Sequence, residues 1–230
     1  MPTYTLCLLN KNYSSWSCRA LLTARHVKLP LEVEMFYMDD PNFKQKIQKF
    51  SPTLKAPALK VTEDSGHSYI IWDSLAILEY LAELHPEIHP TEREERAIAR
   101  SVAAEMHSGF PKIREKMPYN VRARKDLTLD SKRDEELQNE IRRIVQIWEE
   151  CRLRTLKKKS SDDEGFLFGK FTIADAMYFP ICYRFRTYNI PIENGYAKKY
   201  METIFNWPLG KELEQEAEQE DHIVALYEYI

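Results

Sequence analysis

The chain has 230 residues, a mass of 27.2 kDa and a mean hydropathy of -0.53, with 43% hydrophobic and 30% charged residues. These values indicate a globular protein with room for two small domains, and they argue against a disordered or membrane-embedded chain. The formal net charge of -3 provides no overall basic field for nucleic acid or an anionic bilayer, so neither is expected as a partner.

The amino-terminal stretch, MPTYTLCLLNK, lacks a basic region and has only a short apolar run, which favours a cytoplasmic location over secretion. The four cysteines lie far apart within apolar or helical runs, as buried free thiols do: Cys7, Cys18, Cys151 and Cys182. We expect no disulfide and no metal site, since no pair has the spacing of a zinc knuckle.

Residues 1–85 show the pattern of a βαβ unit, a short helix and a ββα unit. Residues 3–9 predict a buried strand, residues 14–27 a helix, and the alternation of residues 31–37 a second strand parallel to the first. Residues 42–50 predict a short helix, residues 57–61 and 69–72 two strands, and residues 74–85 a closing helix. We therefore expect an α/β domain here.

The rest of the chain is predicted to be all helical. Pro86 and Pro90 interrupt the helical pattern and stiffen the backbone, so we place a linker between two domains at residues 86–91. Residues 92–230 lose the strand signals and show long amphipathic segments. Thr172-Ile173-Ala174-Asp175 is a hydroxyl-x-x-acid capping signal that begins a mostly apolar helix, which we expect at the centre of this domain.

Two runs of like charge lie in the helical part. Residues 112–125 contain six basic side chains, which suit either a solvated helix face or a site that attracts an anionic ligand. Residues 212–221 are rich in Glu and Gln and predict a solvated terminal helix.

Four segments together resemble the soluble glutathione transferases, especially serine-type classes such as the zeta-like, tau-like and bacterial relatives. They are residues 10–19 (NKNYSSWSCR), 51–57 (SPTLKAP), 72–77 (WDSLAI) and 169–176 (GKFTIADA). The resemblance implies a thioredoxin-like, glutathione-binding domain over residues 1–85 and an all-helical domain over residues 92–230 that lines the electrophile site. It also implies a homodimer that conjugates the thiol of glutathione to a small, hydrophobic electrophile, as in detoxification.

Ser14 is the residue to which the resemblance assigns catalysis, with Ser15 as the second choice. Ser14 precedes a predicted helix, where unpaired backbone N–H groups and the positive end of the helix dipole favour an anion. Its hydroxyl can donate a hydrogen bond to a thiolate and so lower the pKa of the glutathione thiol from the ordinary value of about 8.5. From the residues alone, Ser14 fits a plain helix N-cap as well.

The other glutathione contacts that the resemblance implies come from two further segments. Pro57 is the family's cis-proline, which turns the backbone of Ala56 toward the cysteinyl part of glutathione. Asp73 faces the ammonium group, Ser74 binds the γ-glutamyl carboxylate from a helix start, and Lys55 binds the glycyl carboxylate.

The second substrate is expected in a cleft between the two domains. An apolar wall is predicted from Trp16, which can cover the thiol, and from four residues of the helical domain: Met106, Phe110, Met117 and Tyr119. Each of these side chains also suits a core position. The basic run of residues 112–125 is a hint of an acidic electrophile.

Two other functions fit the same residues. A glutathione-dependent cis-trans isomerase of the maleylacetoacetate type also resembles this Ser-Ser-x-Ser site, and a non-catalytic glutathione-fold protein binds ligands or partners without forming a thiolate. Tyrosine and cysteine mechanisms are not expected, because Leu8 and Leu9 lie where tyrosine-type classes have tyrosine, and Ser14 lies where cysteine-type relatives have cysteine.

Overall fold

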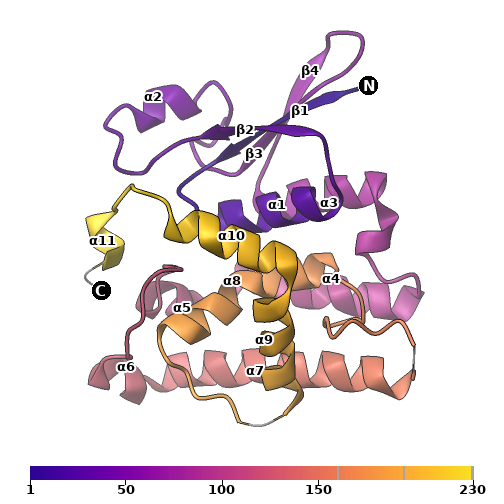
Figure 1. The fold of residues 1–230 in the computed structure, drawn as a ribbon, viewed down its shortest axis with the longest axis vertical. Helices are drawn as coiled ribbons and strands as arrows, with labels where there is room; N and C mark the ends of the chain where they lie inside the picture. Colours follow the sequence, from indigo (N-terminus) through magenta and orange to yellow (C-terminus); the bar gives the residue numbers. More distant parts are fainter. Residues whose placement is uncertain (160, 194, 229–230) are drawn as a thin grey trace.

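The computed structural model describes residues 1–159, 161–193 and 195–228, and its first part is a four-stranded sheet with helices on both faces (Figure 1). Its elements are β1 (Thr3–Leu8), α1 (Ser15–His26), β2 (Leu31–Met35), α2 (Phe43–Ile47), β3 (Ala58–Thr62), β4 (Ser68–Trp72) and α3 (Ser74–Leu84). The strand order is β2-β1-β3-β4, with β1 parallel to β2 and β3 antiparallel to both of its neighbours. This thioredoxin-like arrangement confirms the predicted βαβ, helix and ββα order.

The alternation along β1 divides the apolar side chains between the two faces of the sheet. Leu6 and Leu8 belong to the main core, which they share with residues of α1 and α3. Cys7, between them, packs on the other face in a small cluster with Ala58 and Phe36. All four cysteines are buried free thiols, as predicted.

The helix α2 is shorter than the sequence predicts. It ends at Ile47, because the amide of Phe50 bonds to the carbonyl oxygen of Ile47 at 2.9 Å in a tighter, three-residue turn. The chain then passes through a loop that leads into β3 and forms part of the site described below.

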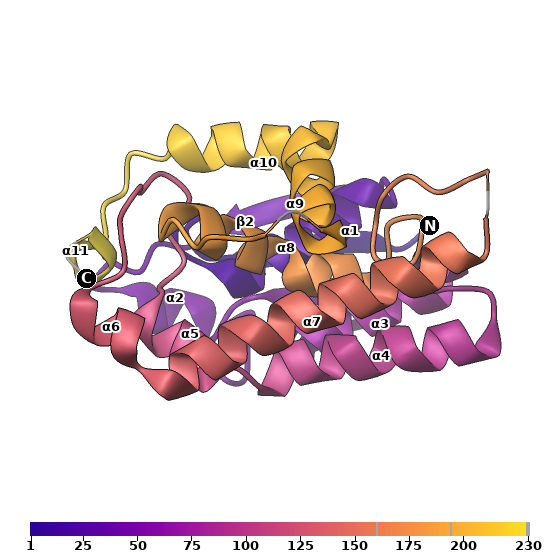
Figure 2. The same ribbon diagram turned by 90° about the horizontal axis from the view of Figure 1, so that it is seen from below.

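The second part is helical, as predicted (Figure 2). Its elements are η1 (Pro86–Ile88), α4 (Arg93–Ser108), α5 (Pro111–Lys116), α6 (Leu129–Arg133), α7 (Glu135–Lys157), α8 (Ile173–Thr187), α9 (Tyr196–Asn206), α10 (Pro208–Glu218) and α11 (Ala225–Glu228). The helix α8 contacts both α1 and α4, so it lies between the sheet part and the rest of the helices. No helix within the described ranges is long and apolar enough to cross a membrane.

The start of α8 has the predicted capping arrangement. Asp175 is fully buried, and its Oδ2 accepts hydrogen bonds from the backbone N–H and the hydroxyl of Thr172, both at 2.8 Å. Its Oδ1 accepts from the backbone N–H of Leu167 at 2.9 Å. One carboxylate therefore ties the loop before α8 to the first turn of that helix.

The predicted linker at residues 86–91 contains the short 3₁₀ helix η1. Ile88 is fully buried in the main core, and Nε2 of His89 lies 3.0 Å from a carboxylate oxygen of Glu79 on α3. The segment is packed against the sheet part, and the proposed domain limits remain a prediction from the sequence.

Candidate active site

A cavity of about 410 Å³ is lined by residues of both the sheet part and the helical part. From the sheet part its walls are formed by Leu9, Tyr13, Ser14, Ser15, Trp16, Met38, Phe43, Leu54, Lys55 and Ala56, and from the helical part by Arg114, Pro118, Tyr119, Arg184 and Tyr227. The structure thus brings together the predicted serines, the loop before β3 and two of the predicted electrophile contacts.

Ser14 is the N-cap of α1 and is 5% exposed. Its Oγ accepts a hydrogen bond from the backbone N–H of Ser17 at 3.3 Å and donates one to Oγ of Ser17 at 2.9 Å. A cap at this position is stabilised by the unpaired N–H groups of the first turn. The Ser14 hydroxyl therefore has to rotate away from Ser17 to donate its hydrogen bond to a ligand.

Ser15 is the first residue of α1 and is contacted from the helical part. Its Oγ accepts a hydrogen bond from Nη2 of Arg184 at 3.3 Å, and Arg184 also donates to the carbonyl oxygen of Met117. Burial lowers the pKa of Arg184 to about 10, so this arginine is still cationic at neutral pH. The Ser15 oxygen thus accepts a hydrogen bond from a positive charge, and its own O–H can donate a hydrogen bond to an acceptor in the cavity.

The loop before β3 supplies the opposite wall. The Ala56-Pro57 peptide bond is cis, which confirms that prediction, and Ala56 lies on the cavity wall while Pro57 is buried. Lys55 also lines the cavity, and its side chain is exposed to solvent.

Asp73 and Ser74 begin α3 and are not among the described residues that line the cavity. Asp73 has φ 75° and ψ 134°, a sparsely populated conformation for a residue other than glycine, which is often found at ligand sites. Its Oδ1 caps the helix through the N–H of Leu75 at 2.8 Å, and its Oδ2 lies 3.3 Å from Nε2 of His107 on α4. The Ser74 Oγ is buried and has no hydrogen-bond partner among the described residues.

The structure places two of the five residues of the predicted apolar wall at this cavity and three elsewhere. Trp16 and Tyr119 line the cavity. Met106, Phe110 and Met117 are buried in the main core and are absent from the cavity wall. Their apolar side chains fill the spaces between packed helices, which the sequence alone does not distinguish from a ligand wall.

Comparison with known proteins assigns the chain to a family. The family profile described as "Glutathione S-transferase, N-terminal domain" matches residues 13–84, and the one described as "Glutathione S-transferase, C-terminal domain" matches residues 122–204. The chain belongs to the glutathione S-transferase family. The resemblance found in the sequence motifs is thereby confirmed.

Three relatives of this family are similar over different lengths. A maleylacetoacetate isomerase of Dictyostelium discoideum is 37% identical over 91 residues, which are 39% of this chain and 41% of that protein, so the match spans less than half of the relative. A glutathione transferase family member from Pseudomonas fluorescens, solved with two glutathione bound, has a TM-score of 0.68 at 18% identity over 92% of each chain. A maleylacetoacetate isomerase from Anaeromyxobacter dehalogenans has a TM-score of 0.64 at 21% identity, over 97% of this chain and 95% of its own. The two structures support the glutathione transferase fold.

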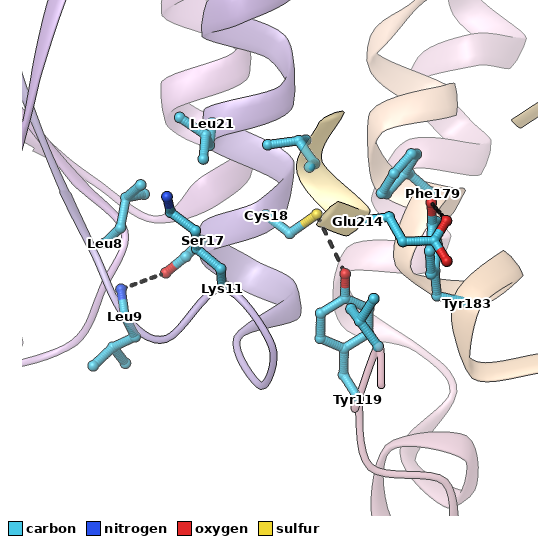
Figure 3. A pocket seen from close by; sticks show the side chains of 12 residues that line it. Leu8, Leu9, Lys11, Ser17, Cys18, Leu21, Tyr119, Phe179, Tyr183 and Glu214 are labelled. Atoms are coloured by element: carbon cyan, nitrogen blue, oxygen red, sulfur yellow. Dashed lines mark hydrogen bonds between the residues drawn. The ribbon is translucent and has the colours of Figure 1, made fainter. Parts of the chain in front are cut away.

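Cysteine-type chemistry finds no support at Cys18, the cysteine of α1. Its Sγ borders a small space of about 20 Å³. The hydroxyl of Tyr119 donates to this Sγ at 3.5 Å, and Figure 3 shows the two groups facing each other. Burial raises the pKa of the Cys18 thiol to about 11, so the thiolate is disfavoured at neutral pH. Cys18 thus fills space between α1 and the helical part.

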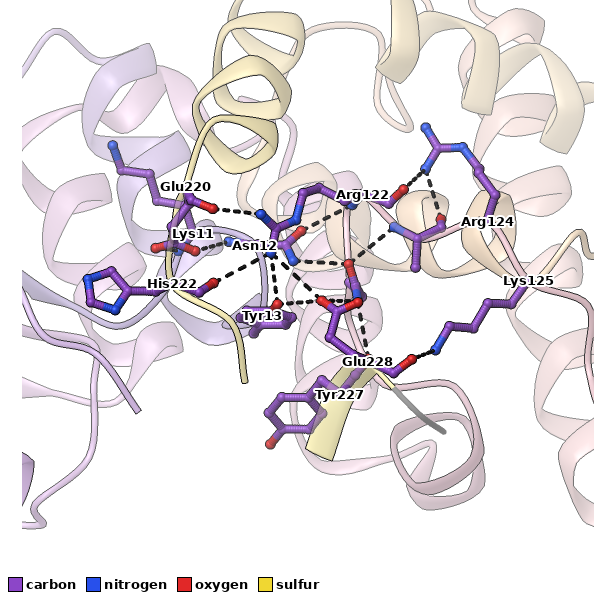
Figure 4. Close-up of polar contacts among 12 residues, drawn as sticks. Lys11, Asn12, Tyr13, Arg122, Arg124, Lys125, Glu220, His222, Tyr227 and Glu228 are labelled. Atoms are coloured by element: carbon purple, nitrogen blue, oxygen red, sulfur yellow. Dashed lines mark hydrogen bonds and ion pairs between the residues drawn. The ribbon is translucent and has the colours of Figure 1, made fainter. Parts of the chain in front are cut away.

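The carboxyl-terminal segment of this member of the glutathione S-transferase family crosses the loop that precedes Ser14, as Figure 4 shows. Glu220 accepts hydrogen bonds from the backbone N–H groups of Lys11 and Asn12, both at 3.0 Å. Tyr227 stacks on Tyr13 with ring centroids 5.8 Å apart, and it lines the cavity. Most of residues 212–221 lie in α10, in line with the predicted terminal helix. Glu216 and Glu220 are not simply solvated, however, since they accept hydrogen bonds from Lys11 and Asn12, more than 200 residues away.

Replacing Glu220 by alanine is expected to release this segment. The N–H groups of Lys11 and Asn12 would lose their carboxylate partner, and a charge-assisted hydrogen bond stabilises by about 1.5–3 kcal/mol. We expect these two amides to exchange hydrogen roughly tenfold faster, as measured by exchange with heavy water. The variant Glu218→Gln, in which an exposed acidic group of the same segment is changed, should leave both rates unchanged. Equal rates in the Glu220 variant would contradict the role assigned to this carboxylate.

Three arginines at or beside this cavity are not among the residues that the sequence patterns predict for the site. Arg184 falls within the apolar pattern of α8, Arg19 within that of α1, and Arg114 within the basic run of residues 112–125. The sequence feature that could have indicated them is an arginine within an otherwise apolar helix. An arginine is almost never fully buried without a partner, so such a residue points to a polar site.

Proposed function

We propose that this chain is a glutathione transferase that conjugates the thiolate of glutathione to a small electrophile, with Ser14 as the residue that stabilises the thiolate. The observation that supports this most directly is the shared cavity wall, where Ser14 and Ser15 at the start of α1 lie with Ala56 of the cis-proline loop. An anion at that position meets the amino-terminal end of a 12-residue helix and two hydroxyl groups.

In the proposed complex, glutathione lies along the wall with its thiol at the serines. Ala56 offers its backbone to the cysteinyl part, and Lys55 offers a positive charge to the glycyl carboxylate. The γ-glutamyl end is assigned to Ser74, whose buried Oγ has no partner among the described residues, and to Asp73 for the ammonium group. Homodimer formation, a cytoplasmic location and a part in detoxification remain predictions from the family resemblance.

The proposed reaction needs only an ionised thiol. The thiol proton passes to solvent, and the sulfur electron pair forms a bond to the electrophilic carbon. The leaving group departs with its bonding pair, or the displaced π electrons take up a proton at the neighbouring atom. Ser14 acts by donating a hydrogen bond to the sulfur anion, which favours the thiolate over the thiol.

A glutathione-dependent cis-trans isomerase is the second candidate. It is favoured by the 37% identity to the Dictyostelium maleylacetoacetate isomerase over 91 residues. Isomerisation returns glutathione unchanged, whereas conjugation consumes it. Turnover of maleylacetone without loss of free thiol would therefore support the isomerase, and a non-catalytic binding protein would bind glutathione without lowering its thiol pKa.

The decisive test is an ultraviolet titration of the glutathione complex that follows thiolate absorbance against pH. We expect the wild type to lower the thiol pKa by at least 1 unit from about 8.5, and we expect Ser14→Ala to lose most of that shift. Each pKa unit corresponds to about 1.4 kcal/mol of thiolate stabilisation. The exposed Ser101→Ala on α4 is the matched control and should titrate as the wild type does. An unshifted thiol in the wild-type complex would overturn the proposed transferase.

A further inference from the structure

The cavity wall carries an excess of positive charge. Of the described residues that line it, three are cationic, namely Lys55, Arg114 and Arg184, and none is acidic. In the proposed complex Lys55 meets the glycyl carboxylate of glutathione, so its charge is matched. Arg114 of α5 and Arg184 of α8 come from the helical part, which the glutathione contacts proposed above do not use.

Arg114 and Arg184 are held by neutral partners rather than by carboxylates. Arg114 donates to the carbonyl oxygens of Gly109 at 3.1 Å and His107 at 3.3 Å, and to that of Met106. Arg184 donates to the Met117 carbonyl and to Ser15, and its Nε is buried without a partner among the described residues. Carbonyl oxygens fix the direction of each guanidinium group but carry no counter-charge. The charge of Glu140 opposes the effect of burial on the pKa of Arg114, but the two side chains form no ion pair.

A third arginine, Arg19, adds positive charge to the same region. Arg19 of α1 is fully buried, and neither of its two Nη atoms has a hydrogen-bond partner within the described part of the chain. The guanidinium carbons of Arg19 and Arg114 lie 4.5 and 4.7 Å from the centre of the Trp16 ring. Burial lowers the pKa of Arg19 to about 9, and the charges of Arg114 and Arg184 act in the same direction. These three arginines form no ion pair with any described carboxylate.

A buried charge without a counter-charge is costly, and a site that retains several of one sign is suited to a ligand of the opposite sign. We propose that Arg114 and Arg184 bind a carboxylate of the electrophile, so that the second substrate is an organic acid with an apolar body against Trp16 and Tyr119. This assignment rests on the proposed transferase function and specifies its substrate class. A guanidinium group is well suited to a carboxylate, because its planar N–H groups match the two oxygens.

The positions of Arg114 and Arg184 would place the bound carboxylate near the reacting sulfur. Arg184 touches Ser15 at the start of α1, beside Ser14, and Arg114 lies over Trp16, the next residue along. An acid bound there holds its electrophilic carbon close to the thiolate. The reaction is then faster, because the two reacting atoms are already oriented toward each other. The arginines would also favour the thiolate itself, and an experiment has to separate that effect from binding of a second anion.

The test uses two ligands that differ only in one carboxylate, S-benzylglutathione and S-(4-carboxybenzyl)glutathione, with affinities measured by titration calorimetry. Both contain the glutathione part, and neither has a free thiol, so thiolate stabilisation does not contribute. We expect the wild type to bind the carboxylated ligand at least tenfold more tightly, and Arg114→Gln to reduce that ratio about tenfold. Arg93→Gln, an exposed arginine at the start of α4, is the matched control and should keep the wild-type ratio.

The ratio of the two affinities within one variant cancels any general effect of the substitution on the fold. Arg114→Lys keeps the charge without the planar fork and should give an intermediate ratio. A ratio near 1 in the wild type, with both ligands bound, would overturn the carboxylate site and leave the proposed transferase intact. A high ratio that Arg114→Gln does not change would overturn the assignment to Arg114. If neither ligand bound, the proposed function and the inference would both fall.

Discussion

Replacing Ser14 by alanine is expected to lower kcat/KM for conjugation of 1-chloro-2,4-dinitrobenzene by roughly 10- to 100-fold at pH 7. A charge-assisted hydrogen bond to the sulfur anion is worth about 1.5–3 kcal/mol, and each 1.4 kcal/mol is a factor of ten in rate. The defect should shrink as the pH is raised through about 8.5, because the thiol then ionises without help. The measurement is the pH profile of kcat/KM for wild type and variant at saturating glutathione.

The same substitution also removes the N-cap of α1, so loss of activity has to be separated from loss of structure. Removal of a serine cap costs about 1 kcal/mol. Aspartate caps helices about as well as serine does, but its ionised side chain has no hydrogen to donate, so Ser14→Asp should keep the helix cap and show activity as low as Ser14→Ala or lower. Wild-type activity in Ser14→Asp would contradict the role of the hydroxyl and would direct attention to Ser15, whose Oγ accepts from Arg184.

The elements with strong local patterns could be predicted from the sequence. The alternation of residues 31–37 gave the second strand, β2, and the Thr172 to Asp175 spacing gave the start of α8, because each depends on neighbours within a few residues. The cis bond before Pro57 followed from the family resemblance, since propensity alone favours trans.

The parts that could not be predicted depend on contacts between distant residues. Glu220 bonds to the backbone of Lys11 and Asn12, more than 200 residues away, and no periodicity encodes that pairing. Met106 and Met117 are apolar residues of a kind that can line a ligand site. Only the packing of neighbouring helices places them in the core. Arg184 becomes part of the cavity because α8 crosses α1 near Ser15.

Replacing Asp175 by alanine is expected to lower the free energy of unfolding by about 3 kcal/mol or more. The substitution leaves two backbone N–H groups and one hydroxyl without their acceptor, and each buried unsatisfied donor costs about 1–3 kcal/mol. Urea denaturation at pH 7 measures the change. Asp130→Ala, at an exposed position in α6, is the control and should change stability by less than about 0.5 kcal/mol. A similarly small change in the Asp175 variant would mean that water replaces the carboxylate in the folded protein.

The pH dependence of stability gives a second, independent measure of the same carboxyl group. Burial raises the pKa of Asp175 from 3.8 to about 6, against the effect of its hydrogen-bond donors, so the folded state holds this proton more tightly than the unfolded state does. The resulting stabilisation is fully present below about pH 4 and is lost as the pH rises through about 6. Over that window the wild type should lose about 3 kcal/mol relative to Asp175→Asn, which has no proton to release. Parallel stability curves for the two proteins would show that Asp175 has the same pKa folded and unfolded, in which case its donors offset the cost of burial in full.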